Sequence, residues 1–331
     1  MKALILAPFD PLCLDELRTR MEAIHESWLE SRRLYSPEEL TTRLNDENIG
    51  ILVVEADFVL EETLQQAPGL RFLGICRNAT TQIDVDVATE MGVVVVNSPG
   101  RNALAVAELV LGLMFCLARK ITACHNYVTS GSWEDPVSPY LELRGTELEG
   151  KTLGIVGLGS IGSVVARKSR ALGLEVIAYD PYLPPGRRDR CDVRMVDLDE
   201  LLRRSDFVSL HVSPGPESAG VIGGEGLERM KSSAFLINTS SPQAVDQGAL
   251  EEALEKGRIA GAALDVHEAS PLPPGHPLLQ MDNVILTPHI GGATDGTIER
   301  HSRMMIEDIE CFLAGRRPPR IVNPSVWGHG A

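Results

Sequence analysis

A glycine-rich segment near the middle of the chain has the residue types and spacing of a dinucleotide-binding turn. After an apolar run come Gly157, Gly159 and Gly162 in the pattern G-x-G-x-x-G. The first glycine permits a tight turn, the second lets a pyrophosphate approach the backbone, and the third lets a helix pack on the strand. Backbone N–H groups of Ser160 and Ile161, at the start of a predicted helix, are suited to phosphate binding. The segment predicts a nucleotide site, and a glycine-rich turn without a ligand is the alternative.

An acidic residue after the next apolar run favours NAD over NADP. Asp180 follows the run 175–179 and comes eighteen residues after Gly162. A carboxylate there can accept hydrogen bonds from both ribose hydroxyls and repels a 2′-phosphate. Arg187 and Arg188 follow closely, and their charge would favour that phosphate. We therefore predict NAD as the cofactor, with NADP as the alternative.

Two blocks of alternating strand and helix patterns must position these residues. The predicted strands span residues 3–7, 51–54, 72–75 and 93–96 in the first block, and 152–156, 175–179, 207–211, 234–238, 259–264 and 284–286 in the second. Strands that alternate with helices pair in parallel through right-handed crossovers. We therefore predict an α/β protein with two doubly wound parallel sheets, the second of them six-stranded.

The predicted helices indicate how the two blocks are connected. The clearest helical patterns span residues 103–118, 160–172, 198–204, 246–255 and 297–313. Because the second sheet is complete before residue 297, we expect the last helix and the Pro-rich tail to return to the first sheet. This gives a discontinuous substrate domain, 1–101 with 297–331, around a nucleotide-binding domain, 102–296.

Composition excludes several other classes of protein. Lys plus Arg number 31 against 46 Asp plus Glu, a net charge of −15 without a basic stripe, which argues against nucleic-acid binding. Hydrophobic residues make up 44% and charged residues 23%, as in folded globular proteins.

Cysteine spacing and apolar runs predict the compartment. The six cysteines contain no C-x-x-C pair, so we expect neither a disulfide framework nor a metal site. The longest apolar stretch, 103–118, is shorter than a membrane span, and the apolar start at residues 3–7 is too short for a signal peptide. We expect a cytoplasmic protein without membrane contact.

Further motifs carry a family resemblance. They lie at residues 148–162, 206–211, 261–266, 271–277 and 283–292. Together they resemble the D-isomer-specific 2-hydroxyacid dehydrogenases, which include phosphoglycerate and glyoxylate/hydroxypyruvate reductases, over nearly the whole chain. The resemblance implies a Rossmann NAD domain inserted into a flavodoxin-like substrate domain, a cleft between domains, and a homodimer formed around the 103–118 helix. It also implies hydride transfer between NAD and C2 of a small 2-keto or 2-hydroxy acid.

The resemblance assigns roles to two residues of the second block. His289, in the segment Thr-Pro-His-Ile-Gly-Gly, matches the family's proton donor, and imidazole suits that task because its pKa is near neutrality. Asp265 matches the family aspartate near the nicotinamide carboxamide, with a structural carboxylate as the alternative. His211 matches a strand end and is expected to be structural.

Two positions depart from the family pattern. Ser241 stands where the family has the arginine that binds the substrate carboxylate, and Ser270 stands where it has the glutamate that orients the histidine. Glu268 lies two residues from the second position, which is not the family's catalytic one. Serine offers neither a bidentate fork nor a negative charge, and loss of one such contact costs on the order of 10²–10³ in turnover. We expect modified catalysis by Ser241 and Ser270 together with His289.

Other residues are candidates to replace the lost contacts. Arg77 stands where the family usually has glycine, in a loop whose backbone N–H groups at Asn78 and Ala79 are suited to hold an anion. We hypothesise that Arg77, together with Arg101, binds the substrate's anionic group; a solvated surface arginine is the alternative. His267 replaces a usual phenylalanine and is a second candidate polar group.

Two functions remain open at this stage. The first is an NAD-dependent oxidoreductase with a non-standard small-molecule substrate, supported by the glycine motif, Asp180, Asp265 and His289. The second is a catalytically impaired NAD-binding dimer that acts as a sensor or binds a partner, supported by Ser241 and Ser270. Imine reduction or a redox-neutral dehydration is a third possibility without specific residue evidence.

Overall fold

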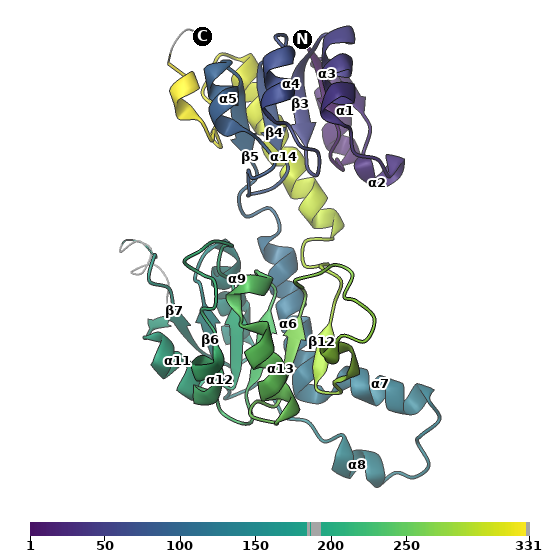
Figure 1. Cartoon of the computed structure of the whole chain (residues 1–331), viewed down its shortest axis with the longest axis vertical. Coiled ribbons are helices and arrows are strands. Elements are labelled where there is room, and N and C mark those ends of the chain that lie inside the picture. The colour runs from purple at the N-terminus through teal and green to yellow at the C-terminus, as the bar shows by residue number, and fades with distance from the viewer. Residues whose placement is uncertain (184–185, 187–192, 329–331) are drawn as a thin grey trace. The chain divides into compact units, whose positions relative to one another are not determined.

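The chain folds into two compact units in a computed structural model that describes residues 1–183, 186 and 193–328 (Figure 1). Unit 1 comprises Met1–Arg101 and Thr294–Ala331, and unit 2 comprises Asn102–Ala293. Arg187 and Arg188, weighed above for NADP binding, lie outside the described residues. Within the described residues, no helix has both the length and the apolar content needed to cross a bilayer.

Unit 1 is built on a five-stranded parallel sheet. In spatial order its strands are β2 (Glu22–His25), β1 (Lys2–Ile5), β3 (Ile49–Val54), β4 (Phe72–Ile75) and β5 (Val94–Asn97). The order 2-1-3-4-5 is that of flavodoxin-like doubly wound sheets, so the predicted fold class is confirmed for this unit. The prediction missed β2, because its four residues carry a glutamate and a histidine and only Ala23 is buried.

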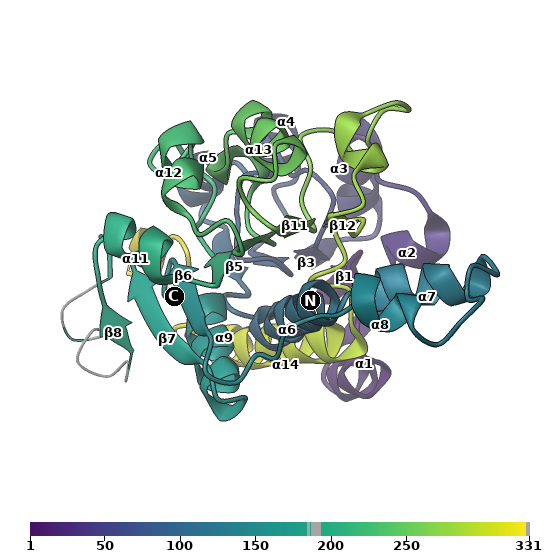
Figure 2. The same cartoon turned by 90° about the horizontal axis from the view of Figure 1, so that it is seen from below.

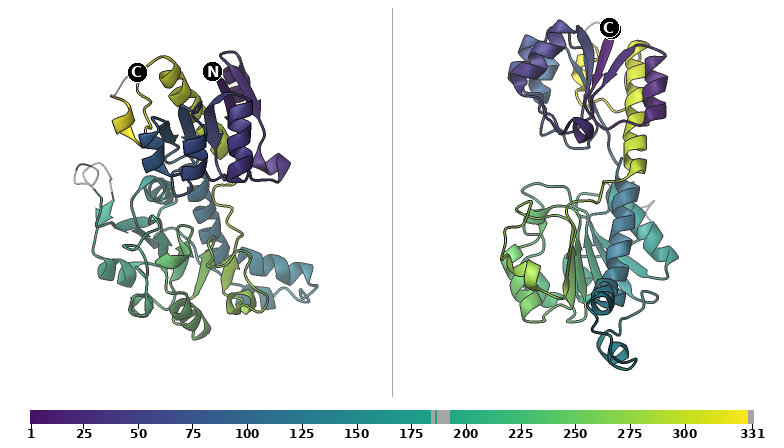
Figure 3. Two further views of the ribbon diagram at one scale, coloured as in Figure 1. Left: turned by 45° about the horizontal axis from the view of Figure 1, so that its top comes forward. Right: turned by 90° about the vertical axis from the view of Figure 1, so that its right-hand side faces the viewer.

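Helices cover both faces of this sheet (Figure 3). One face is covered by α1 (Pro11–Arg18) and α14 (Asp295–Leu313), and the other by α3 (Pro37–Asp46), α4 (Glu61–Gln66) and α5 (Val85–Glu90). A short helix, α2 (Trp28–Ser31), follows β2. Leu17 and Ile309 are buried on the first face, and Leu40 and Leu64 on the second. The inner strands β1, β3 and β4 therefore lie between two apolar layers, which explains their mainly hydrophobic sequences.

The C-terminal segment is anchored to the edge strand β5. Asn323 accepts a hydrogen bond from the Val95 N–H (2.9 Å) and donates one to the Val93 carbonyl (2.9 Å). Upstream, Arg320 donates to the buried Asp308 of α14 (2.7 Å). A short 3-10 helix, η3 (Pro324–Val326), follows. Residues from the two ends of the chain thus complete one unit.

Unit 2 is built on a seven-stranded parallel sheet. In spatial order its strands are β12 (Val284–Leu286), β11 (Gly261–Leu264), β10 (Phe235–Asn238), β9 (Phe207–Leu210), β6 (Thr152–Val156), β7 (Glu175–Tyr179) and β8 (Arg194–Met195). The doubly wound class is confirmed, but the predicted strand number of six was wrong. The extra strand β8 has only two residues, too few to show a pattern in sequence.

Two helix layers enclose this sheet (Figure 2). One face carries α6 (Ala103–Arg119) and α9 (Ser160–Ala171), and the other carries α11 (Leu198–Arg204), α12 (Gly224–Arg229) and α13 (Gln247–Glu255). Two 3-10 helices, η1 (Pro242–Ala244) and η2 (Pro277–Gln280), follow β10 and β11. Two further helices among the described residues, α7 (Ile121–Thr129) and α8 (Ser138–Glu142), bury no residue.

Candidate active site

The turn between β6 and α9 requires two of its glycines for the fold itself. Gly157 has φ = 92°, and a Cβ there would come within 2.6 Å of the His211 carbonyl oxygen. A Cβ on Gly162 would meet the Gly157 carbonyl oxygen at 2.1 Å. These contacts set the turn and bring α9 close to the sheet.

The remaining glycine leaves space for a ligand. A Cβ built on Gly159 meets no atom within 4 Å, so the protein itself does not need a glycine there. Gly159 is the N-cap of α9, and no side chain caps the helix. The first backbone N–H groups of α9, including those of Ser160 and Ile161, are therefore left without a side-chain acceptor. Open space at Gly159 beside these donors fits a pyrophosphate.

Asp180 closes the glycine turn from the end of β7. Its Oδ2 accepts a hydrogen bond from the Leu158 N–H (2.8 Å), and its Oδ1 accepts one from the Tyr182 N–H (3.0 Å). The carboxylate is partly buried at the end of β7. This position fits the ribose hydroxyls of an adenine dinucleotide.

Asp265, at the end of β11, organises the loop that follows β12. Its Oδ1 accepts from Thr287 Oγ1 (2.6 Å) and from the Ile290 N–H (2.9 Å), and its Oδ2 accepts from the Gly291 N–H (2.8 Å). The side chain is 1% exposed. Asp265 thus has the hydrogen bonds of a structural carboxylate, which was the alternative to a cofactor contact. That it also contacts the cofactor remains a proposal.

His289 lies inside the loop that Asp265 holds. Its backbone is left-handed (φ = 57°), a conformation that costs about 1–3 kcal/mol in residues other than glycine unless the surroundings hold it. The residue is exposed, and no side chain in the described part of the chain hydrogen-bonds its imidazole. His289 is therefore held through its backbone with its ring available.

The other two histidines of unit 2 considered above have protein partners. His267 is partly buried, and its Nε2 lies 2.9 Å from the Thr287 carbonyl oxygen. His211 Nε2 lies 2.9 Å from Ser209 Oγ. Burial lowers the pKa of His211 to about 3, which keeps the ring neutral. His211 therefore has the structural place expected for it.

Ser241 is buried behind the end of β10. It is 2% exposed, and its hydroxyl donates to Gln243 Oε1 (2.7 Å). Asn238 fixes the turn, because its side-chain amide donates to the Ser241 carbonyl (2.7 Å). Ser270, by contrast, is exposed. The structure thus gives Ser241 a local partner and leaves Ser270 at the surface of unit 2.

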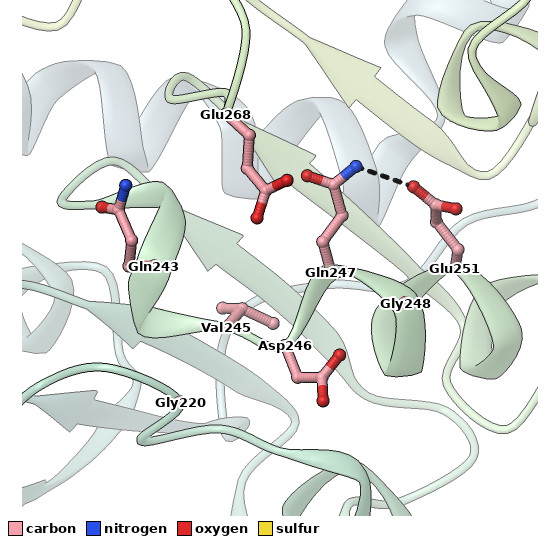
Figure 4. Close-up of a pocket in the computed structure, with 8 residues that line it drawn as sticks. All are labelled: Gly220, Gln243, Val245, Asp246, Gln247, Gly248, Glu251 and Glu268. Atoms are coloured by element: carbon pink, nitrogen blue, oxygen red, sulfur yellow. Dashed lines mark hydrogen bonds between the residues drawn. The ribbon is translucent and has the colours of Figure 1, made fainter.

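A pocket of about 540 Å³ lies beside Gln243 in unit 2 (Figure 4). It is lined by Gly220, Gln243, Val245, Asp246, Gln247, Gly248, Glu251 and Glu268. Gln247 donates to Glu251 (2.9 Å), and Glu268 reaches the pocket from the loop after β11. Its ionisable lining is entirely acidic, so the pocket itself repels a carboxylate.

Comparison with known proteins agrees with this geometry. The family model for the NAD-binding domain of D-isomer-specific 2-hydroxyacid dehydrogenases matches residues 111–291. The chain belongs to that family. As a dehydrogenase of this type it is an oxidoreductase, and its cofactor is NAD.

Individual relatives support the assignment. A glyoxylate reductase of Thermofilum pendens is 38% identical over 312 residues, 92% of this chain and 88% of the relative. A D-3-phosphoglycerate dehydrogenase of Methanocaldococcus jannaschii is 36% identical over 95% of this chain, which spans only 58% of that protein. An NAD-complexed D-isomer-specific 2-hydroxyacid dehydrogenase of Lactobacillus delbrueckii ssp. bulgaricus superposes with a TM-score of 0.81 at 26% identity, covering 98% of this chain and all of that one.

The candidate anion-binding loop of this dehydrogenase follows β4 in unit 1. Arg77, Asn78 and Ala79 are all exposed. The loop is tied to the end of β5, because the Ser98 N–H donates to the Arg77 carbonyl (2.9 Å) and the Asn97 side chain donates to the Asn78 carbonyl (2.7 Å). Within the described residues, the Arg77 guanidinium makes no ion pair. Its charge is available to a ligand.

Arg101 has a different environment in unit 1. Its guanidinium pairs with Glu55 (2.6 Å), the two side chains being 14% and 10% exposed, and it contacts His301 Nδ1 (2.8 Å). His301 Nε2 lies 2.7 Å from the Pro8 carbonyl oxygen, and Trp28 Nε1 donates to Glu55 (3.1 Å). Since a carbonyl only accepts, His301 carries its proton on Nε2 and Nδ1 accepts from Arg101. Burial is the main reason that the pKa of His301 is lowered to about 4, so the ring is neutral at pH 7. The charge of Arg101 is therefore neutralised by Glu55 inside unit 1, unlike the charge of Arg77.

The partners of Arg101 could not be identified from the sequence. Glu55 and Trp28 are far from Arg101 in sequence and belong to no motif. The apolar run 49–54 that ends directly before Glu55 was the one available signal, because charged residues often follow buried parallel strands at a binding edge.

Proposed function

We propose that the protein reduces the carbonyl group of a small 2-keto acid or related compound, with His289 as the proton donor. One observation carries the proposal: Asp265 holds the turn around His289 with three hydrogen bonds, while the residue itself stays exposed in a left-handed conformation. Such backbone strain, maintained by a buried carboxylate, is a feature of functional sites. An imidazole held in this way is suited to exchange a proton with a bound substrate.

In unit 2, different residues bind the cofactor and transfer the proton. When bound, NADH supplies the hydride that reduces the carbonyl carbon. His289 donates its ring proton to the carbonyl oxygen, which becomes a hydroxyl group, and it accepts the proton again in the reverse direction. Gly157, Gly159 and the start of α9 hold the pyrophosphate, and Asp180 holds the ribose. Asp265 keeps the loop of His289 in place.

Substrate selection follows from the residues near Ser241. The Ser241 hydroxyl is committed to Gln243, and the adjoining pocket is acidic, so we propose that this region does not bind a carboxylate. For an anionic substrate group we propose Arg77, which forms no ion pair with any residue that the structure describes, together with the N–H groups of Asn78 and Ala79. Arg101 would contribute only if its pairing with Glu55 were broken. Ser270 is neutral and exposed, so it cannot supply the carboxylate that orients the histidine in the family pattern.

Turnover with a panel of carbonyl compounds tests the proposal. Nicotinamide absorbance is followed with glyoxylate, hydroxypyruvate, phenylpyruvate and the matching aldehydes and ketones without a carboxylate. The wild type should turn over at least one compound, and His289→Asn should lower kcat by about 100-fold or more while the NADH Kd stays within about twofold. An unchanged rate in His289→Asn would remove the histidine from the mechanism. An unchanged KM in Arg77→Ala would remove Arg77 from substrate binding.

A second candidate function, that of a sensor or partner-binding protein, is favoured because Ser270 stands where the family has a glutamate. No described side chain hydrogen-bonds the imidazole of His289, and Ser241 is buried against Gln243. Both features fit an NAD-binding dimer that senses cofactor or binds a partner. Tight NADH binding in calorimetry without turnover of any panel compound would favour this function over the reductase.

We also propose that the protein is a cytoplasmic homodimer. Helices α7 and α8 bury no residue and carry large exposed side chains, including Ile121, Val128, Tyr140 and Leu141, and Trp133 in the segment between them is exposed as well. An apolar patch of this kind favours association. Light scattering should give twice the chain mass, and Val128→Glu combined with Tyr140→Glu should give the monomer mass; a wild-type monomer would contradict the proposal.

A further inference from the structure

The loop that carries His289 needs more than one support. Asp265 binds the side chain of Thr287 and the N–H groups of Ile290 and Gly291, so it holds both ends of the loop. Gly291 allows this close approach, because a Cβ there would lie 2.9 Å from Asp265 Oδ2. None of these bonds reaches the backbone of His289 itself.

The Thr287 carbonyl is the group that connects directly to His289. This oxygen lies 3.0 Å from the His289 N–H, which donates to it. It also lies 2.9 Å from Nε2 of His267. A carbonyl has two lone pairs and can accept both bonds, and since it cannot donate, the His267 proton is on Nε2. The Thr287 N–H donates in turn to the Leu264 carbonyl (3.0 Å), so the residue is held from both sides.

We infer that His267 is a positioning residue for His289, acting through the carbonyl of Thr287 that both residues share. The inference rests on the proposed function for the role of His289, but the contacts that carry it do not. If the His267 bond is lost, the carbonyl can turn, and the left-handed backbone of His289 loses a neighbour that limits it. The ring of His289 would then sample more orientations.

The geometry argues against His267 as the proton donor. Its Nε2–H is committed to a backbone carbonyl, and donation to a substrate would require that bond to break. The ring is also partly buried, whereas His289 is exposed. His267 therefore acts on His289 and not on the substrate.

Variants of His267 separate positioning from general stability. His267→Phe keeps a flat ring without a donor, and His267→Gln restores an N–H donor of similar reach. His25→Phe is the matched control, because His25 Nε2 makes the same kind of bond to a backbone carbonyl, that of Ala7 (3.1 Å), in unit 1. We expect His267→Phe to lower kcat by about tenfold with KM and the NADH Kd within about twofold, in keeping with the loss of one hydrogen bond. His267→Gln should recover most of kcat, and His25→Phe should keep it.

A second measurement does not depend on turnover. Hydrogen exchange of the segment 287–292, followed by mass spectrometry, should be about tenfold faster in His267→Phe than in the wild type. It should return toward wild type in His267→Gln and stay unchanged in His25→Phe. Equal exchange and equal kcat in His267→Phe and wild type would overturn the inference, and so would equal losses in the Phe and Gln variants. If the exchange follows the expectation while no substrate is turned over, the reductase function fails and the positioning role stands.

Discussion

Charged side chains at the carboxyl edges of the two sheets have different roles. In unit 1, Arg101 lies after β5, pairs with Glu55 and donates to His301, and Glu55 also accepts from the indole of Trp28, so the protein itself neutralises the charge of Arg101. In unit 2, Asp265 lies after β11 and uses both oxygens on one loop, and the residue that this loop presents, His289, stays exposed. In unit 1 the charged groups of Arg101 and Glu55 bind each other. In unit 2 the buried carboxylate of Asp265 fixes a loop, and the His289 side chain on that loop remains available to a ligand.

This difference separates residues that stabilise from residues that do chemistry. A buried arginine that is fully paired contributes to a unique fold, and removing either partner leaves an uncompensated charge. An exposed histidine on a fixed backbone adds little to stability but is available to a ligand. The predictions below test each side of the comparison, in order of decreasing expected effect.

Breaking the pair in unit 1 should give the largest effect. Arg101→Met leaves Glu55 buried without its cation, and we expect the free energy of unfolding of unit 1 to fall by about 3–5 kcal/mol. Urea unfolding followed by fluorescence of Trp28, with Trp133 and Trp327 replaced by Phe, measures this directly. Arg303→Met, which breaks an exposed pair with Glu299 within α14, is the control and should leave the midpoint nearly unchanged.

The double variant Glu55→Gln/Arg101→Met sharpens the same test. It removes both charges, so most of the lost stability should return. If Arg101→Met alone is as stable as the wild type, the guanidinium is not structural, and Arg101 would again be available for substrate binding.

Filling the open space at Gly159 should mainly affect the cofactor. Gly159→Val adds atoms where the protein has none within 4 Å, so folding should be preserved. Overpacking against a bound pyrophosphate costs about 1–3 kcal/mol, and we expect the NADH Kd to rise by about 100-fold. Calorimetry measures the change, with Gly224→Val, an exposed glycine at the start of α12, as the control. Unchanged NADH affinity would mean that the pyrophosphate does not approach this residue.

The buried histidine of unit 1 should make that unit sensitive to acid. The pKa of His301 is lowered to about 4 by burial, whereas in the unfolded chain it is near 6.5. Below pH 6.5 the unfolded chain therefore binds the proton and the folded unit does not. The contribution of neutral His301 to the free energy of unfolding is complete above pH 6.5 and is lost as the pH falls toward 4. About 2 kcal/mol of the free energy of unfolding is lost between pH 7 and pH 5.

A variant isolates this contribution. His301→Gln can keep a donor to the Pro8 carbonyl and an acceptor for Arg101 but does not titrate. The stability difference between pH 7 and pH 5, measured by urea unfolding with Trp28 as the probe, should shrink by about 2 kcal/mol relative to the wild type. An identical pH dependence in both proteins would show that His301 does not titrate in this range.

Removing the charge of Asp180 should have the smallest effect. Asp180→Asn can still accept from the Leu158 N–H, but it lacks the charge that repels a 2′-phosphate. We expect the NAD Kd to rise by about tenfold and the preference over NADP to fall, because hydrogen bonds to charged groups are worth about 1.5–3 kcal/mol. Asp197→Asn, at the N-cap of α11, is the control. An unchanged NAD to NADP ratio of affinities would assign the selectivity to other residues.

Most of the sheet framework could be predicted because apolar strands stand out in sequence. The runs at Phe72–Ile75, Thr152–Val156, Glu175–Tyr179 and Val284–Leu286 are strands with the predicted bounds. Strand β2 could not be recognised, since most of its residues are only partly buried and its composition is that of a loop. A strand is recognised from sequence by a run of apolar residues, and β2 has a glutamate at its start and a histidine at its end.

The site was predictable at its motifs but not in its pairings. The glycine turn has a local pattern that the backbone itself requires, so Gly157 and Gly162 could be assigned roles from spacing alone. The pairing of Arg101 with Glu55 and the bonds from Asp265 to the loop of His289 join residues that are distant in sequence. Such contacts depend on the tertiary fold, and a single sequence does not record them. The same limit applies to His267, whose partner is a backbone carbonyl.

The return of the C-terminal segment to β5 has a consequence for how the protein is made. Asn323 and α14 supply bonds and apolar surface that the first sheet lacks until residues 295–323 have left the ribosome. Residues 102–293, which form the other unit, are synthesised before that segment and without interruption. We therefore expect the inserted unit to fold first during translation, and the N-terminal strands to complete their packing only after residues 295–323 have been made.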